Sequence, residues 1–302
     1  MSAAVTRAVP GDFTLPRRMA GFVALTKPRI IELLLVTTLP TMVVAARGLP
    51  GWGLMVATLA GGTLAAGGAN AINMVVDRDI DSVMRRTRNR PLVTGLVSPT
   101  QALVFALALE LLAFVELWVA VNPLSAVLAV SATLFYVFVY TLWLKRTSRQ
   151  NIVIGGAAGA VPVLVGWAAV RNSIGWATVV LFALMFVWTP PHFWALAIRY
   201  REDYRSVDVP MLPVVVSFKR TAVSILSYTA LVVAASLLFA WVAGMGPLYW
   251  VSAVVLGAVF LALAYLLWKE PTEALAMRLF RWSITYVTLL FAAMAADQLI
   301  FH

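Results

Sequence analysis

The sequence contains no cysteine among its 302 residues. This absence excludes disulfide bonds, thiolate metal sites, thioester chemistry and haem attachment through a CxxCH motif. Charged residues are also scarce, at 12%, whereas hydrophobic residues make up 62% and the mean hydropathy is +0.90. A soluble domain of this size is about half apolar and a quarter charged. The composition therefore excludes a soluble protein and indicates a polytopic membrane protein.

Nine apolar stretches are long enough to cross a bilayer, which takes about 20 residues each. We therefore predict an all-α membrane protein with nine transmembrane helices in a single domain over residues 1–302. Residues 1–21 contain Asp12 and no apolar h-region, so we expect a flexible cytoplasmic terminus and no cleaved signal peptide. The stretches lie at about 30–46, 53–76, 100–120, 124–144, 151–170, 175–199, 221–243, 247–268 and 279–300.

The 23 basic residues are distributed unevenly along the chain. Of these, 21 fall in one alternating set of loops, and only Arg47 and Arg171 fall in the other. The positive-inside rule predicts that the larger set, with the N-terminus, faces the cytoplasm. Topology thus explains the net charge of +10, and we expect no nucleic-acid partner. Two acidic loops follow stretches that are four helices apart, which predicts two parallel four-helix halves plus a ninth helix.

The first acidic loop carries the strongest chemical signal. Asn73, Asp77 and Asp81 are spaced by four residues, so a continuing helix places them on one face. Hard oxygen ligands in such an arrangement suit Mg²⁺, and the arginines that follow suit the oxygens of a phosphate. The alternative is a solvated loop whose arginines only set the topology. Asp79 points away from this face.

The second acidic loop, RYREDYRSVDVP at 199–210, supplies Glu202, Asp203 and Asp208. Two acidic clusters on one side of a bundle could hold one diphosphate through Mg²⁺ and ease its departure. Asp203 is the best candidate ligand, whereas Asp208 could equally cap a turn before Pro210. The alternative is again a topology loop with local ion pairs.

These motifs resemble the UbiA superfamily of intramembrane prenyltransferases. The resemblance starts with the Asn73, Asp77 and Asp81 spacing and RRTRNRPL at 85–92. Three further stretches are similar to the branch of the family that farnesylates haem: TKPRI at 26–30, WTPPHFWA at 188–195, and YREDY at 200–204 with VPMLP at 209–213. The likeness covers nearly the whole chain and implies a UbiA-like helix bundle.

The resemblance implies Mg²⁺-dependent transfer of a farnesyl group from farnesyl diphosphate to a vinyl group of haem B, which gives haem O and diphosphate. It also implies a bacterial inner-membrane enzyme whose active site faces the cytoplasm, associated with a haem A synthase or other oxidase-assembly factors. The implied catalytic and metal-binding residues are Asn73, Asp77, Asp81 and Asp203, and the implied diphosphate contacts are Arg86 and Arg90.

One departure concerns the second motif, which in the family often has two aspartates four residues apart. Here Arg199 precedes Asp203 at that spacing, so the second site contacts phosphate directly through Arg199 or binds a single metal ion. Lys27 and Arg29 open the first helix, where they set topology or hold phosphates or haem propionates.

His192 is the only histidine inside an apolar stretch. Our hypothesis is that it contacts the porphyrin, as an iron ligand or a propionate partner; the alternative is a hydrogen-bonded packing residue. Trp188 and Trp194 flank the proline pair before it and could line a haem or isoprenoid cavity. Among the intramembrane acids, Glu110 is the deepest, and we expect it to pair inside the bundle.

Three other functions stay open. Prenyl transfer to an aromatic acid in quinone synthesis uses the same motifs, although the WTPPHFW stretch argues against it. A haem or lipid transporter also uses repeats and intramembrane acids, but it would place its charges near the middle of the bilayer. A structural assembly subunit would need none of the acids for its function.

Overall fold

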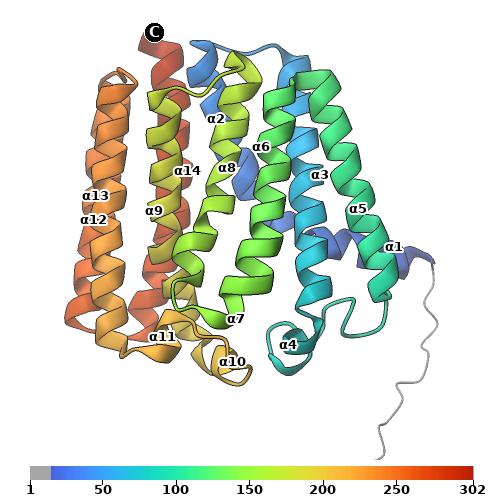
Figure 1. Cartoon of the computed structure of the whole chain (residues 1–302). Helices are drawn as coiled ribbons and strands as arrows, with labels where there is room; N and C mark the ends of the chain where they lie inside the picture. Colours follow the sequence, from blue (N-terminus) through green and yellow to red (C-terminus); the bar gives the residue numbers. More distant parts are fainter. Residues whose placement is uncertain (1–14, 302) are drawn as a thin grey trace, which may run out of the picture.

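The computed structural model describes residues 15–301, apart from the side chains of residues 29, 30 and 33–35. All regular secondary structure in this range is helical, which confirms the predicted all-α membrane fold (Figure 1). The long helices are α2 (Pro28–Ala46), α3 (Trp52–Val76), α5 (Pro99–Glu116), α6 (Pro123–Leu134), α8 (Asn151–Arg171), α9 (Trp176–Arg199), α12 (Phe218–Val242), α13 (Pro247–Lys269) and α14 (Glu273–Phe301).

Every apolar stretch of the sequence forms a helix close to its expected bounds. Eight helical spans in the described range are long and apolar enough to cross a membrane, and α2 adds the shorter apolar helix Val36–Ala46. Two of the spans end in π-helical segments, η1 (Leu117–Val121) after α5 and η2 (Phe135–Leu144) after α6. The count of nine spans and the cytoplasmic N-terminus stay predictions.

Four short helices mark one end of the bundle, which we call the charged end: α4 (Arg78–Val83), α7 (Lys145–Thr147), α10 (Arg201–Arg205) and α11 (Leu212–Val215). They lie together at the lower end of Figure 1. Because α3 leads into α4 and α9 leads into α10, the two acidic loops emerge at the same end. This is the arrangement that two parallel halves predict.

Helix α1 (Leu15–Thr26) corrects one expectation. Residues 15–21 were expected to be part of a flexible terminus, but they form the first half of this helix. It is ordered because its inner face packs on neighbouring segments: the Phe22 and Phe105 rings lie 5.1 Å apart, and Gly21 lies against the side chains of Leu96 and Val97. The helix runs across the bundle beside α3 and α5 (Figure 1).

Helix caps explain why the apolar stretches begin where they do. The Ser98 hydroxyl accepts from the Gln101 amide at 3.2 Å, and the Gln101 side chain accepts from the Ser98 amide, which closes a capping box at the start of α5. The Asn122 side chain caps α6 in the same way through the Ser125 amide at 2.9 Å. These polar residues fix the turns between spans.

The packed core is concentrated in the second half of the chain. Its largest cluster comes mainly from α8, α9, α12, α13 and α14 and holds the fully buried rings of Tyr249, Tyr286, Phe239, Phe260 and Phe291. The first half contributes smaller clusters. A large cavity lies between α2, α3, α6 with η2, α8 and α9. The halves therefore meet around a hollow, with the dense packing on one side of it.

Candidate active site

The first motif lies where α3 joins α4. The backbone bonding continues through this junction: the Asp77 amide donates to the Asn73 carbonyl, and the Asp81 amide donates to the Asp77 carbonyl, both at 2.9 Å. The three side chains therefore share one helix face, and all three are buried. Asn73 Nδ2 also donates to Asp77 Oδ2 at 2.7 Å.

Basic side chains neutralise the two carboxylates of this motif. Lys145, which follows η2, pairs with Asp77, and Arg90 pairs with Asp81. Asp77 is fully buried and Lys145 is 14% exposed, so this pair is shielded from water. Buried charges persist only when they are paired in this way.

Asp77 nevertheless keeps one unsatisfied oxygen. In the part of the chain that the structure describes, its Oδ1 atom has no hydrogen-bond partner, and Arg146 Nη2 lies 3.9 Å from it. Residues 15–301 hold no group of three Asp, Glu or His side chains that could bind a metal alone. Two carboxylates, an amide oxygen and phosphate oxygens are a donor set that Mg²⁺ accepts. The buried oxygen and this donor set therefore fit a divalent cation.

Lys27 joins the motif from the turn between α1 and α2. Its Nζ donates to Asn73 Oδ1 at 3.0 Å, and its backbone is in the left-handed region at φ 54°. Burial and, to a smaller extent, the nearby charges of Arg90 and Lys145 lower the pKa of Lys27 to about 7, although the charges of Asp77 and Asp81 act in the opposite direction. The site thus holds a crowded set of cations, ready for an anionic ligand.

Asp203 brings the second acidic loop to the first. Its Oδ1 accepts from Arg85 Nε at 3.1 Å and its Oδ2 accepts from the Arg86 backbone amide at 3.3 Å. The carboxylate is buried, although the Arg85 side chain is 77% exposed. The Arg86 guanidinium lies 5.4 Å from the centre of the Tyr200 ring, which also belongs to the second loop. The two loops therefore meet over the arginine segment.

The other charged residues of the second loop lie outside this meeting point. Arg199 is half exposed, and its nearest carboxylate is Glu273 at 3.9 Å, so the structure does not bring Arg199 to the predicted diphosphate site. Glu202 pairs with Arg205 at 2.8 Å on the surface. Asp208 adopts a left-handed turn conformation at φ 54°, as a turn residue would.

The cavity between the halves has a volume of about 540 Å³ and opens beside the motif. The rim of the cavity at the charged end carries charged side chains, while its walls include alanines, glycines, threonines and aromatic rings. Asp77, Asp203, Arg199 and Trp194 do not line it. The predicted site residues that do are Lys27, Asn73, Asp81, Arg86, Arg90, Trp188 and His192.

His192 is held firmly in the cavity wall. Its ring stacks between Trp188, at 4.3 Å, and Phe280, at 4.7 Å. The Ser283 hydroxyl lies 2.7 Å from His192 Nδ1 and donates its own proton to the Phe280 carbonyl. Nδ1 must therefore be the donor to Ser283, and the lone pair of Nε2 is left for a ligand.

The structure corrects the expectation for Trp194. This side chain is buried in the main core, edge-on to Tyr228 at 5.4 Å, and not in the cavity. The reason is helical geometry: Trp188 and His192 are four residues apart and share a face, whereas Trp194 is six residues from Trp188 and points elsewhere. Arg29, the other predicted haem contact, has a side chain outside the described residues.

Several residues of the site were missed in the sequence. Lys145 was assigned to topology, yet it is the partner of Asp77. Tyr136 and Tyr140 stack at 5.4 Å in η2 and line the cavity, and Gly155 gives Tyr140 its space. A π-helix often marks a functional site, but an apolar sequence does not reveal one.

Asp79 also has a partner that the sequence did not suggest. Arg146 makes two hydrogen bonds of 2.7 Å with its carboxylate, and these bonds lower the pKa of Asp79 to about 2. This pair is largely exposed and lies outside the buried face of the motif, as the sequence predicted.

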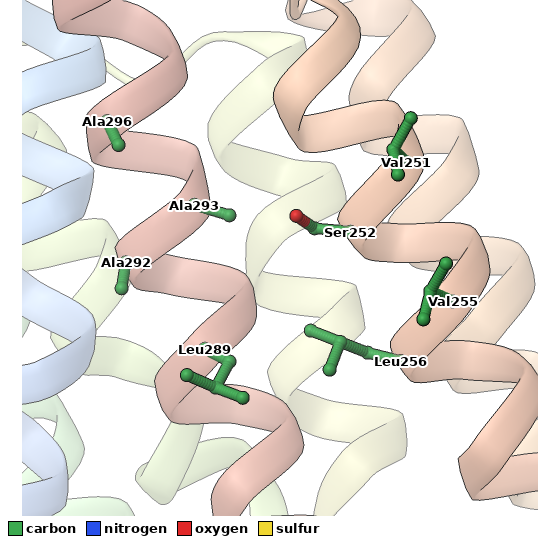
Figure 2. Close-up of a pocket in the computed structure, with 8 residues that line it drawn as sticks. All are labelled: Val251, Ser252, Val255, Leu256, Leu289, Ala292, Ala293 and Ala296. Carbon is green, nitrogen blue, oxygen red and sulfur yellow. The ribbon is translucent and has the colours of Figure 1, made fainter.

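A second hollow, of about 480 Å³, lies between α13 and α14, far from the motif in the sequence. Figure 2 shows its lining of aliphatic side chains, with Ser252 as the one hydroxyl. A diphosphate or a metal ion would find no charged group there. The candidate active site is therefore the cavity at the charged end.

Comparison with known proteins assigns the family. The profile of the UbiA prenyltransferase family matches residues 34–290. The chain belongs to the UbiA prenyltransferase family. This UbiA family member is 54% identical over 286 residues to a protoheme IX farnesyltransferase of Parafrankia sp. (strain EAN1pec), covering 94% of this chain and 91% of the relative. A protoheme IX farnesyltransferase of Nocardioides sp. (strain ATCC BAA-499 / JS614) is also 54% identical over 288 residues, covering 93% and 92%.

Solved structures show the same fold at low sequence identity. A UbiA homologue from Aeropyrum pernix K1 aligns with a TM-score of 0.69 and 20% identity, covering 88% of this chain and 98% of the homologue. A UbiA homologue from Archaeoglobus fulgidus, bound to GPP and Mg²⁺, aligns with a TM-score of 0.63 and 17% identity, covering 91% and 99%. This UbiA family member is thus an integral-membrane prenyltransferase with the family fold.

Proposed function

We propose that this prenyltransferase moves a farnesyl group from farnesyl diphosphate to a vinyl group of haem B, giving haem O and diphosphate. The names of its relatives support haem as the acceptor class. The observation that carries the proposal is the buried Asn73, Asp77 and Asp81 face, with one unsatisfied carboxylate oxygen, beside a cavity with apolar walls. We also propose that the protein lies in the bacterial cytoplasmic membrane with this site facing the cytoplasm.

Mg²⁺ is the proposed cofactor, and Asn73, Asp77 and Asp81 would hold it. When bound, the cation would neutralise charge that develops on the departing diphosphate. Asp203, predicted as a further ligand, would complete the site from the second half. In the structure its carboxylate holds Arg85 and the Arg86 amide, so it also orients the arginine segment.

The diphosphate would lie at the charged rim of the cavity. Arg86, Arg90 and Lys27 line this rim and can donate to the diphosphate oxygens. Their positive charge favours the state in which the carbon–oxygen bond has broken and the diphosphate is fully charged. Arg90 is already positioned by its pair with Asp81.

The farnesyl chain would extend into the cavity. Rings of Tyr136, Tyr140 and Trp188 line it, and their faces can stabilise the allylic cation that forms when the diphosphate leaves. Walls of alanine and glycine on α3 and α8 leave room for the chain and limit the entry of water. The vinyl group would then attack this cation.

His192 is the proposed haem contact. Its Nε2 lone pair is available because Ser283 occupies Nδ1, and the ring is fixed by stacking on Trp188 and Phe280. A neutral imidazole presented in this way suits haem iron or a protonated propionate. Arg29 stays a predicted propionate partner, and association with a haem A synthase or another oxidase-assembly factor stays part of the proposal.

Product analysis tests this function directly. The purified protein in detergent or vesicles is incubated with haem B, farnesyl diphosphate and Mg²⁺, and the porphyrins are analysed by mass spectrometry. The expected product is haem O, with one diphosphate released per haem converted. An aromatic acid in place of haem tests the quinone-type reaction, and haem flux into vesicles without diphosphate release tests a transporter. Formation of no haem O under conditions in which either alternative proceeds would overturn the proposal.

A further inference from the structure

Glu110 is an acid inside a membrane-spanning helix that the proposed function does not yet use. Its Oε1 atom accepts a hydrogen bond from Thr133 Oγ1 at 3.2 Å, between α5 and α6. Gly68 of α3 faces the same carboxylate: a Cβ atom there would lie 2.6 Å from Glu110 Oε1. A helix surface without a side chain therefore makes room for the acid. Acids within membrane spans are costly and commonly functional.

Thr133 connects this acid to the cavity. The threonine lines the cavity, whereas Glu110 lies behind the wall. The depth is informative, because Gly68 precedes Asn73 by five residues, or about 7.5 Å along the helix axis. The Thr133 hydroxyl thus lies just beyond the level at which a diphosphate would be held, where the reacting carbon atoms of a bound substrate would be.

A second acid on the same helix provides a comparison. Glu116 faces Gly61 much as Glu110 faces Gly68, since a Cβ at Gly61 would lie 2.2 Å from Glu116 Oε2. This oxygen is buried and has no hydrogen-bond partner among the described residues. Among the described residues, no hydroxyl group of the cavity wall donates a hydrogen bond to this oxygen. Of the two acids, Glu110 is the one linked to the cavity.

We infer that Glu110, through Thr133, accepts the proton released when water adds to the haem side chain. This inference rests on the proposed function. The vinyl π electrons form the new carbon–carbon bond to the farnesyl carbon, and the electron pair of the broken carbon–oxygen bond leaves with the diphosphate. The resulting cation next to the porphyrin ring takes a lone pair of a water molecule, which becomes the hydroxyl of the product.

The protons balance along a short path. The water molecule hydrogen-bonds to Thr133 Oγ1 and passes it one proton, while Thr133 passes its own proton to Glu110 Oε1. Glu110 ends the step protonated and must return the proton to solvent before the next turnover. The residues of α6 that line the cavity are Ala129, Ala132 and Thr133, so Thr133 supplies the one hydroxyl that this helix offers to a water molecule.

The test compares two matched pairs of variants in the full-length protein. Glu110→Gln and Thr133→Val keep the shape of the side chain but remove the proton acceptor or the hydroxyl. Glu116→Gln makes the same chemical change on the same helix without a link to the cavity, and Thr133→Ser retains the hydroxyl. The readouts are haem O formed, diphosphate released, porphyrin product without added water, thermal stability, and affinity for a non-hydrolysable farnesyl diphosphate analogue.

We expect Glu110→Gln and Thr133→Val to lower haem O formation by about 100-fold or more, as loss of a general base does. The farnesylated porphyrin that lacks the added water should accumulate instead. Thermal stability and affinity for the analogue should match those of Glu116→Gln and Thr133→Ser.

Haem O formation by Glu110→Gln at the wild-type rate would overturn the inference and leave the proposed function intact. Equal losses in Glu110→Gln and Glu116→Gln, together with lowered stability, would show a structural role and also overturn it. If Glu110→Gln fails to fold, equal haem O formation by Thr133→Val and Thr133→Ser would overturn the inference. A wild-type protein that makes no haem O would overturn the proposed function itself.

Discussion

Lys145 and Asp77 form a buried ion pair that joins the end of η2 to the end of α3. The two residues are 68 positions apart in the sequence. A second ion pair lies next to this one: Arg146, which follows Lys145, pairs with Asp79, two residues after Asp77. The pair ties two helices of the first half at the charged end. It also places a lysine where a divalent cation would have to share the carboxylate.

This pair allows stability and activity to be separated. Removing one partner of a buried ion pair costs about 3–5 kcal/mol, because the other charge is left uncompensated. We expect Asp77→Asn to lose that much unfolding free energy and nearly all prenyl transfer. The double variant Asp77→Asn with Lys145→Met should regain most of the stability but no activity. Denaturation in detergent and haem O assays measure both; a double variant with restored transfer would contradict the role of Asp77.

Mg²⁺ should stabilise the protein measurably. A ligand at 100 times its Kd adds about 2.7 kcal/mol to the unfolding free energy. We expect this gain in thermal unfolding with Mg²⁺, its reversal by EDTA, and its loss in Asp81→Asn. Asp79→Asn is the matched control, because Asp79 is 60% exposed and lies off the buried face. An equal Mg²⁺ response in both variants would argue against the metal site.

The His192 environment should control haem binding. We expect His192→Ala to weaken haem affinity strongly. Ser283→Ala should weaken it by about 10- to 100-fold, the usual effect of removing the partner that orients a ligating histidine. Ser283→Thr retains a hydroxyl, so its haem affinity and the position of its Soret band should match those of the wild-type protein. Titration followed by absorption spectroscopy measures both, and unchanged haem affinity in His192→Ala would end this hypothesis.

Two glycines of α8 should respond differently to a methyl group. A Cβ at Gly155 would lie 2.3 Å from Tyr140 Cδ2, whereas at Gly159 no described heavy atom lies within 4 Å. We expect Gly155→Ala to lose about 1–3 kcal/mol of unfolding free energy relative to Gly159→Ala, because Tyr140 must shift into the cavity. The gain in helix propensity is common to both variants and cancels. Equal stability of the two variants would show that Tyr140 relaxes freely.

Hydropathy and helix caps made most of the fold predictable. The apolar stretches end at charged or proline-containing turns, so the helix bounds follow closely, as at Asn122 and Pro123. The helix α1 escaped prediction because the apolar run at 19–25 is too short to span a membrane; the helix is held by contacts such as Phe22 with Phe105. Local composition does not report such tertiary contacts.

The geometry of the candidate site was predictable where its residues are close in sequence. The spacing of Asn73, Asp77 and Asp81 survives because the helix continues through the junction at residue 77. The partner of Asp77 comes from a distant loop, and an apolar segment gives no sign that its backbone is π-helical. Trp194 was assigned to the cavity because it lies near the proline pair in the sequence. Its angular position on α9 points it away from the cavity.

The uneven core gives the molecule a stiff side and a compliant side. Buried aromatic rings pack between α12, α13 and α14, whereas the helices around the cavity meet through small residues and threonines. Amide hydrogens of α2 and α3 should therefore exchange sooner than those of α13, because local opening follows low packing density. A bulky, rigid acceptor could then enter by displacing the helices around the cavity, while α12, α13 and α14 keep their positions.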